Sequence, residues 1–261
     1  MPEGRPPQPA ATVLLVRQID KFEVLMVKRH HQIDFASGAL VFPGGKLAED
    51  DAGSGWDDLV EAPAGLDGVE RGLRIAALRE AFEESGLLLA RTARGGPFAP
   101  PEALASLHAQ RDEISTGKAS FRQAIADAGL VLALDGLHRF AHWITPEGMG
   151  KRFDTHFFIA AAPDDQVAAC DGWEAVEAVW LEPNAALAEG RAGLRQIIFP
   201  TRLNLEMLAQ SLSVDEALGA ARARRIVTVT PQIVSEGGGR TLVIPAEAGY
   251  SVTREPFTNG P

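Results

Sequence analysis

The chain has 261 residues, of which 46% are hydrophobic and 23% are charged, a composition typical of globular domains that bury their own core. This usage excludes long disorder, collagen-like repeats and low-complexity sequence. The 25 basic and 35 acidic side chains give a net charge of −10, which argues against nucleic acid or an anionic membrane as partner. The single cysteine, Cys170, excludes an intrachain disulfide and a thiolate metal cluster and favours a reducing, cytoplasmic location.

The N-terminal half alternates β-rich runs with one long helical pattern. Residues 1–10 are proline-rich and are predicted to form a flexible tail before a single domain over 11–261. Strands are predicted at 11–17, 23–28 and 38–42, with a turn at 18–21, and a helix is predicted at 70–88. The segment 48–69 is acidic and rich in Gly and Asp, which predicts a solvated surface insertion.

The C-terminal half contains two additions to this pattern. Helices predicted at 101–114 and 118–128 form a helical insertion over about 99–132, and a C-terminal extension covers about 190–261. Strands are predicted at 136–144, 153–162 and 176–181, and helices at 183–189, 194–212 and 214–224. The apolar runs 226–229 and 241–244 are predicted to pair as a hairpin.

The helix at 70–88 carries an unusual acidic arc. At about 100° per residue, a buried stripe forms on one side, and its members are Ile75, Leu78, Phe82 and Ser85. Glu80, Glu83 and Glu84 lie on the opposite side, where like charges three and four residues apart cost about 0.2–0.5 kcal/mol per pair. A divalent cation would relieve this repulsion, because hard cations bind clustered carboxylate oxygens. A solvated acidic face is the alternative interpretation.

The run from Arg79 to Leu87, REAFEESGL, resembles the second half of the motif of the Nudix hydrolases. The first half of that motif maps onto Gly45 and Asp51, with Asp in place of the usual Glu, and 27 residues separate Asp51 from Arg79 where the ordinary motif has seven. The resemblance implies an α+β fold in which a mixed sheet is sandwiched between helices, with additional inserted and C-terminal helices.

The same resemblance implies an activity and a cofactor. Nudix enzymes hydrolyse a nucleoside diphosphate linked to another moiety with Mg²⁺ or Mn²⁺. By motif position, Glu80, Glu83 and Glu84 are expected to bind the metal and to be catalytic, with Arg79 orienting Glu80. Metal ions suit this reaction because they neutralise phosphoryl oxygens and activate water.

Two further segments, SGALVFPGG at 37–45 and WITPEGMGKRFDTHFFIAA at 143–161, resemble the coenzyme A diphosphatase subfamily, which also carries an insertion inside the motif. This resemblance implies that coenzyme A or acyl-CoA is cleaved to 3′,5′-ADP and (acyl-)phosphopantetheine. Two alternatives stay open. One is a Nudix hydrolase of another nucleotide, such as ADP-ribose, NADH or a nucleoside triphosphate. The other is a Nudix-fold module that binds nucleotide without turnover.

Several residues outside the helix are candidates for substrate contact. Arg29 ends a strand near the expected cleft and is predicted to bind phosphate, including the 3′-phosphate of coenzyme A. Gly44 and Gly45 would let the backbone approach a phosphate closely. Arg152, in the subfamily-like segment, is a further substrate-binding candidate. A small-molecule nucleotide is thus the expected partner, and the sequence leaves the oligomeric state open.

Four other polar residues allow two readings each. Nudix enzymes often place an extra acidic residue, as metal ligand or base, where Glu174 and Glu177 stand, and Glu177 is preferred here as a catalytic residue. The alternative is an exposed strand edge. His142 and His156 are interpreted as core or hydrogen-bonded histidines.

Overall fold

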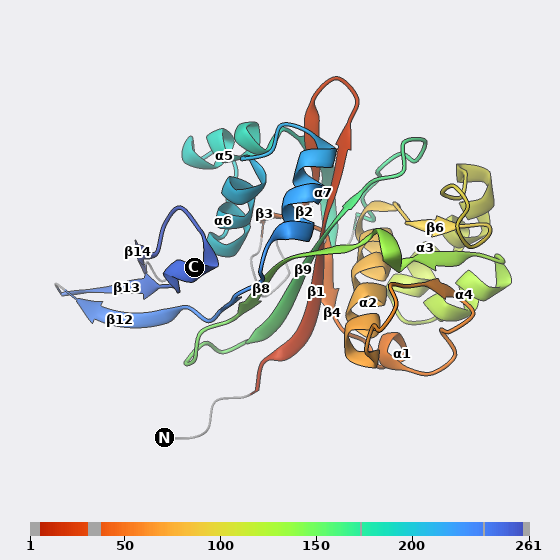
Figure 1. Cartoon of the computed structure of the whole chain (residues 1–261), viewed down its shortest axis with the longest axis horizontal. Coiled ribbons are helices and arrows are strands. Elements are labelled where there is room, and N and C mark those ends of the chain that lie inside the picture. The colour runs from red at the N-terminus through yellow and green to blue at the C-terminus, as the bar shows by residue number, and fades with distance from the viewer. Residues whose placement is uncertain (1–5, 31–37, 173, 237, 258–261) are drawn as a thin grey trace.

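The computed structural model describes residues 6–30, 38–172, 174–236 and 238–257. Its centre is an eight-stranded mixed sheet with helices on both faces (Figure 1), in the order β10-β2-β1-β9-β8-β11, with β3 on β2 and β4 on β1. These strands are β1 (Gln8–Gln18), β2 (Phe22–Arg29), β3 (Leu40–Val41), β4 (Gly44–Lys46), β8 (His138–Ile144), β9 (Phe153–Ala161), β10 (Ala175–Leu181) and β11 (Thr228–Val229). The predicted α+β class is confirmed.

Two layers cover this sheet. The first holds a small sheet, β5-β7-β6, and four helices, with the bounds α1 (Glu49–Ala52), α2 (Gly68–Ser85), α3 (Ala105–Ser115), α4 (Phe121–Asp127), β5 (Val60–Glu61), β6 (Ala90–Arg91) and β7 (Val131–Ala133). The opposite layer holds α5 (Pro183–Arg191), α6 (Phe199–Leu208) and α7 (Val214–Ala223). None of the helices in the described residues is long and apolar enough to cross a bilayer.

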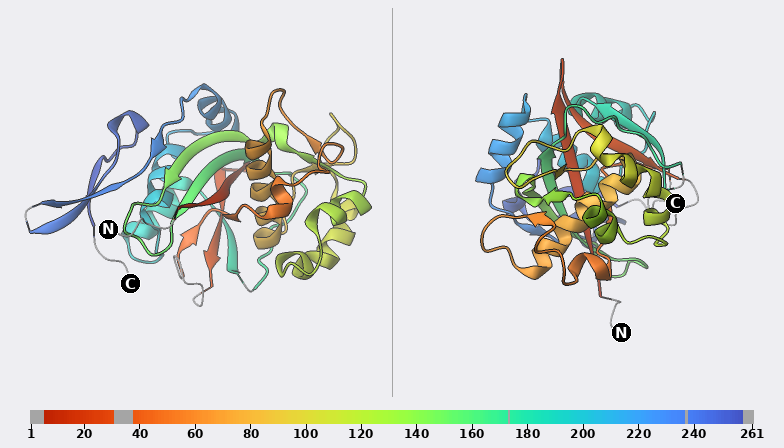
Figure 2. Two further views of the ribbon diagram at one scale, coloured as in Figure 1. Left: turned by 90° about the horizontal axis from the view of Figure 1, so that it is seen from below. Right: turned by 90° about the vertical axis from the view of Figure 1, so that its right-hand side faces the viewer.

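A third sheet extends from the body beyond the C-terminal layer (Figure 2). Its strands, in the antiparallel order β12-β13-β14, are β12 (Gln232–Glu236), β13 (Gly239–Val243) and β14 (Arg254–Pro256). Three short 3₁₀ helices cover Pro101–Leu104, Leu134–Gly136 and Ala246–Ala248.

Strand β1 links the two layers. It pairs antiparallel with β2 and β4 and parallel with β9, and its alternating side chains face different cores. Val13 and Leu15 join the core under α2, whereas Leu14 and Val16 join the core under α6 and α7. Because both faces of the strand are covered, its sequence is a nearly continuous apolar run.

Helix α2 is fixed at both ends by local chemistry. The Asp67 carboxylate accepts a hydrogen bond of 2.8 Å from the Glu70 N–H, which caps the first turn. The helix ends at Gly86, whose φ of 75° is the left-handed conformation that glycine adopts without strain. The predicted end at residue 88 was therefore too late.

The inserted segment 48–69 is exposed at most of its positions, as predicted for a surface insertion, but Asp51, Trp56 and Val60 are buried and anchor it to the core. Trp56 is fully buried with its ring centroid 6.1 Å from that of Phe121, and its Nε1 donates to Asp50 O at 2.8 Å. Val60 pairs with Leu132 of β7. The Gly and Asp content of the segment reflects its local turns. It does not reveal that Trp56 packs against Phe121 of α4, which is distant in the sequence.

Two element boundaries and one strand pairing also differ from prediction. Residues 8–10 belong to β1 and not to a tail, while residues 1–5 lie outside the described part. Helix α6 begins at Phe199 because Ile198 is extended and a proline occupies the first turn. The predicted terminal hairpin is wrong, since Thr228–Val229 pairs parallel with β8, and β13 pairs with β12 and β14. Short apolar runs carry little information on register.

Candidate active site

Strand β4 brings glycine backbone against helix α2. Gly45 lies opposite Ala11 of β1, and a Cβ atom on Gly45 would stand 2.4 Å from the carboxylate of Glu80. A Cβ atom on Gly44 would stand 2.5 Å from Ala11 O. At Gly44 a side chain would require a shift of the backbone, and at Gly45 it would displace the Glu80 carboxylate. The close approach of the glycines to the helix expected from the sequence is therefore present.

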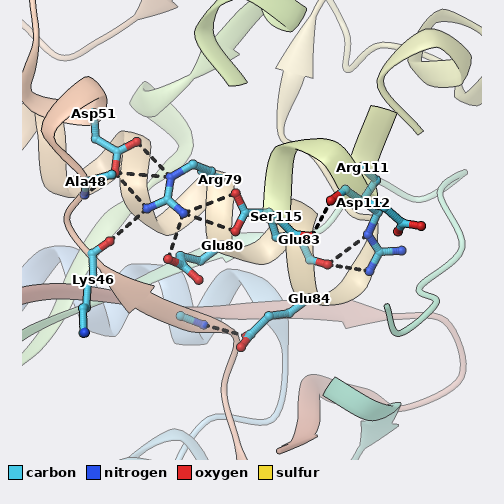
Figure 3. Close-up of polar contacts among 11 residues, drawn as sticks. Lys46, Ala48, Asp51, Arg79, Glu80, Glu83, Glu84, Arg111, Asp112 and Ser115 are labelled. Atoms are coloured by element: carbon cyan, nitrogen blue, oxygen red, sulfur yellow. Dashed lines mark hydrogen bonds and ion pairs between the residues drawn. The ribbon is translucent and has the colours of Figure 1, made fainter. Parts of the chain in front are cut away.

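Arg79 joins the two halves of the sequence motif (Figure 3). Its Nε donates to Asp51 Oδ1 at 3.0 Å, and its Nη2 donates to Asp51 Oδ2 and to Lys46 O, both at 2.9 Å. Its Nη1 lies 2.8 Å from Glu80 Oε1 and 3.3 Å from Glu83 Oε2. One guanidinium therefore contacts three carboxylates, and the pair with Asp51 joins the two halves of the motif across the 27 residues that separate them.

The side chain of Glu84 extends from α2 toward Gly44 of strand β4. The Gly44 N–H donates to Glu84 Oε2 at 3.0 Å, and the side chain is 2% exposed. In the part of the chain that the structure describes, carboxylate oxygens of Glu80, Glu84 and Glu174 lie within 4.8 Å of one another. We call these three residues the acidic cluster.

Burial dominates the protonation of these groups. Burial raises the pKa of Glu84 well above its usual value, and the charge of Glu80 adds to the effect, whereas Arg29 opposes it. Burial also raises the pKa of Glu80, although Arg79 acts against this shift. In the same way, burial raises the pKa of Glu83 to about 7. Ionising all of these carboxylates therefore requires a further positive charge nearby.

The donor set fits a hard divalent cation. Mg²⁺ and Mn²⁺ prefer clustered oxygen ligands, and the acidic cluster supplies them from two separate segments, α2 and the residue just before β10. Gly44 and Gly45 keep side chains out of the space beside it. The burial of the helical glutamates, at 8% exposed for Glu80 and 2% for Glu84, excludes the alternative of a solvated acidic face.

The structure places Glu174 at this cluster and Glu177 elsewhere. Both carboxylate oxygens of Glu177 accept from Arg195, at 2.8 Å each, and this pairing lowers the pKa of Glu177. A register shift in the pairing of β10 with β2 lies between Ala175 and Glu177. The regular spacing of a strand does not predict such a shift, so the sequence could not show which of the two glutamates faces the cluster.

The two arginines predicted to bind substrate, Arg29 and Arg152, have different surroundings. Arg29, at the end of β2, interacts electrostatically with Glu84, and its Nε is buried without a hydrogen-bond partner among the described residues. Arg152 precedes β9, and its Nε donates to Thr145 O at 3.1 Å.

A second group of ligand-type side chains, in the described residues, consists of His142, Asp154 and His156, here called the histidine cluster. His142 Nε2 lies 2.5 Å from Asp154 Oδ1, and its Nδ1 lies 2.8 Å from Thr228 Oγ1. The two imidazole rings stack with centroids 4.0 Å apart and planes 24° apart. Their lone pairs lie in nearly parallel planes, so one ion could not bind both without ring movement. The interpretation as a hydrogen-bonded histidine fits His142, whereas the His156 ring stacks on His142 and its Nε2 lies 3.6 Å from Asp154 Oδ1.

One contact of the glutamate-bearing helix was not predicted from the sequence. Arg111 of α3 donates from Nε and Nη2 to Glu83 O, at 2.9 and 2.8 Å (Figure 3). The available signal was its position, four residues after Leu107 and three before Ile114, both buried. Arg111 thus stands on the apolar stripe of its helix, where a charged residue needs a partner.

The sheet between two helical layers is a fold shared with solved structures. A Nudix hydrolase from Alicyclobacillus acidocaldarius matches with a TM-score of 0.67 and 26% identity, over 84% of this chain and 99% of that one. The family described as the NUDT19 Nudix domain matches residues 66–194. The chain is thus similar to the Nudix hydrolases in fold and sequence, as the motif at Arg79–Leu87 indicated.

Two curated relatives are similar over most of this chain. The putative nudix hydrolase 7 of Caenorhabditis elegans is 30% identical over 201 residues, which is 77% of this chain. The human acyl-coenzyme A diphosphatase NUDT19 is 29% identical over 227 residues, which covers 71% of this chain. The chain spans 60% and 57% of the lengths of these two relatives.

Proposed function

We propose that the protein is a divalent-metal-dependent pyrophosphohydrolase that cleaves coenzyme A or acyl-CoA to 3′,5′-ADP and (acyl-)phosphopantetheine. The observation that carries hydrolysis is the acidic cluster, which is held by a helix and a glycine loop and has more carboxylates than cations around it. The substrate class is supported by the matching family and by the human relative, which is named an acyl-coenzyme A diphosphatase.

The chain's own residues divide the work between positioning and binding. Arg79 orients Glu80 and Glu83 through ion pairs, and the Gly44 N–H fixes the Glu84 carboxylate. Glu174 takes the place that the sequence reading gave to Glu177, because it lies with Glu80 and Glu84. When bound, Mg²⁺ or Mn²⁺ would neutralise charge on the pyrophosphate oxygens and favour ionisation of water.

Arg29 is the proposed contact for a phosphate of the substrate. Its guanidinium lies within electrostatic reach of Glu84, and its buried Nε lacks a partner among the described residues. A charged donor in that state gains from an anionic acceptor. The backbone at Gly44 and Gly45 and the side chain of Arg152 are the other proposed substrate contacts.

A hydrolysis screen with Mg²⁺ and Mn²⁺ tests this proposal. Coenzyme A, acyl-CoA, dephospho-coenzyme A, ADP-ribose, NADH and nucleoside triphosphates would be compared by kcat/KM, with 3′,5′-ADP identified as a product. If Arg29 holds the 3′-phosphate, a charge-assisted hydrogen bond of about 1.5–3 kcal/mol predicts a roughly 10- to 150-fold preference for coenzyme A over its dephospho form. The variant Arg29→Ala should then lose that preference.

Each alternative has its own result in this screen. Faster hydrolysis of ADP-ribose, NADH or a nucleoside triphosphate would assign the enzyme to another nucleotide. Tight binding of coenzyme A with no product under either metal would instead identify a nucleotide-binding module. Equal rates for coenzyme A and dephospho-coenzyme A would contradict the role given to the 3′-phosphate and to Arg29.

A further inference from the structure

Helix α3, which belongs to the helical insertion, reaches the end of the helix that carries the glutamates. The last four carbonyl groups of a helix have no partner within it. In α2, Phe82 O accepts from the Gly86 N–H, and Glu83 O accepts both hydrogen bonds from Arg111. The peptide group that includes Glu83 O joins Glu83 to Glu84. Arg111 therefore hydrogen-bonds to the backbone between Glu83 and Glu84, two of the proposed functional glutamates.

The packing of α3 directs Arg111 to this place. Leu107 and Ile114 are buried in the core under α2, and Arg111 lies between them on the same stripe. A Cβ atom on Gly86 would stand 3.2 Å from Arg111 Nη1, so the guanidinium fills the space beside the helix end. A cation at this end also interacts favourably with the helix dipole.

The segment that carries Glu174 meets the same helix end. The Ala169 N–H donates to Ser85 O at 2.8 Å, which ties the segment between β9 and β10 to the last turn of α2. Asp171 accepts from the backbone N–H groups of Glu174 and Ala175, at 3.2 and 2.9 Å. Of the acidic side chains acting on Arg111, Asp171 has the largest electrostatic interaction.

We propose that Arg111 is a positioning residue of the acidic cluster. It holds the Glu83–Glu84 peptide on one side and acts on the Asp171 turn before Glu174 on the other, and so sets the separation of carboxylates that come from different segments. The helical insertion is then part of the metal-binding machinery, although it supplies none of the carboxylates. This inference rests on the proposed function only in assuming that the acidic cluster binds a divalent cation.

A positioning residue and a simple helix cap differ in whether their removal changes metal affinity. A cap affects the free energy of unfolding and leaves ligand affinity alone. Outer partners that orient metal ligands change metal affinity or activity by about 10- to 100-fold when they are removed. The deciding quantity is therefore the dissociation constant for Mn²⁺, measured without substrate from the rise in Tm with Mn²⁺ concentration.

The test compares Arg111→Met with Arg94→Met. Arg94 is a matched control, because it also donates two hydrogen bonds to carbonyl groups, to Val60 O at 2.6 Å and to Asp57 O at 2.8 Å, away from α2. Arg111→Met is expected to raise the Kd for Mn²⁺ by about 10-fold or more. Arg94→Met is expected to keep the wild-type Kd even where its Tm falls.

The conservative variants Arg111→Lys and Arg94→Lys keep the test decisive if the methionine variant does not fold. Lysine retains the charge but not the forked pair of donors, so Arg111→Lys should weaken Mn²⁺ binding less than Arg111→Met. Equal Mn²⁺ affinity in the Arg111 and Arg94 variants would overturn the proposal. Failure of the proposed function has a different signature, namely a wild type that binds Mn²⁺ and releases no product from coenzyme A.

Discussion

The acidic cluster and the histidine cluster both bring three ligand-type atoms within 4.8 Å of one another, yet they balance charge in different ways. In the histidine cluster, His142 Nε2 is hydrogen-bonded to Asp154 Oδ1 at 2.5 Å, and His142 Nδ1 is hydrogen-bonded to Thr228 Oγ1 at 2.8 Å. In the acidic cluster, Glu84 has one backbone N–H and lies beside other carboxylates. Proximity of ligand atoms is common to both groups, whereas unbalanced buried charge belongs to the acidic cluster.

The difference shows why only one of the two groups calls for a cation. Hydrogen bonds occupy both ring nitrogens of His142 and one oxygen of Asp154, so an ion at these atoms would have to displace contacts that already exist. Burial raises the pKa of Glu84 because nearby charges do not compensate it, so an ion would relieve an existing cost. Four expected outcomes test this contrast.

The largest expected effect is on turnover. Replacing Glu84 by Gln keeps the size of the side chain but supplies an amide, which is a poor ligand for a hard cation, so kcat should fall by about 100-fold or more. The free energy of unfolding without metal should stay the same or rise, because a buried charge is removed. The control Asp154→Asn should keep kcat within about 3-fold. Full turnover in Glu84→Gln would contradict the assignment of the acidic cluster.

Metal should stabilise the protein through the acidic cluster alone. At 100-fold excess over Kd, Mn²⁺ should add about 2.7 kcal/mol to the stability, which corresponds to a rise in Tm of about 5–10 °C. Thermal melts with and without Mn²⁺ measure this shift. It should vanish in Glu84→Gln and persist in His156→Gln. Loss of the shift in His156→Gln would show that the histidine cluster also binds the ion.

Without metal, the glutamates should make the protein less stable as pH rises. Burial raises the pKa of Glu83 to about 7 in the folded chain, so the folded state holds a proton that the unfolded state, with an ordinary pKa near 4.5, releases. The stability is then lost between about pH 4.5 and 7, by roughly 1–3 kcal/mol. Denaturation in EDTA across this range measures the loss, and Glu83→Gln should flatten the curve. An unchanged slope in that variant would exclude Glu83 as its cause.

The histidine cluster should act in the opposite direction, with a smaller effect. Burial, together with the charge of His142, lowers the pKa of His156 to about 4, so the unfolded state takes up a proton near pH 6.5 before the folded state does. Stability should fall as pH drops from about 6.5 toward 4, by about 1–2 kcal/mol after allowance for partial exposure. Asp154 and Glu70 oppose this shift, while Arg139 adds to it. His156→Gln should remove the dependence, and a curve unchanged by that substitution would contradict it.

Periodicity and motif were enough to predict the elements that position the glutamates. The pattern of apolar residues gave α2 to within three residues of its end, and the β1–β2 hairpin has its turn where the sequence placed it. The motif identified Arg79 and its three glutamates, which the structure brings together. These features depend on contacts close in sequence or on one helix, where spacing carries the information.

The features that escaped prediction depend on partners far along the chain. Trp56 is buried because Phe121 lies beside it, and nothing in the segment around Trp56 announces that contact. Glu177 was preferred over Glu174 because the sequence shows neither Arg195 as its partner nor the register shift after Ala175. A bulge or a distant ion pair changes the direction of one side chain without changing local composition.

The segment between Asp51 and Arg79 offers a place at which the chain could be divided into two fragments. Residues 62–65, at the tip of that segment, are exposed, while Trp56 and the pairing of Val60 with Leu132 hold its earlier part in place. Exposed loop tips tolerate cleavage and insertion. A chain divided at 62–65 would carry Asp51 on one fragment and Arg79 on the other, so hydrolysis would report the association of two separate polypeptides.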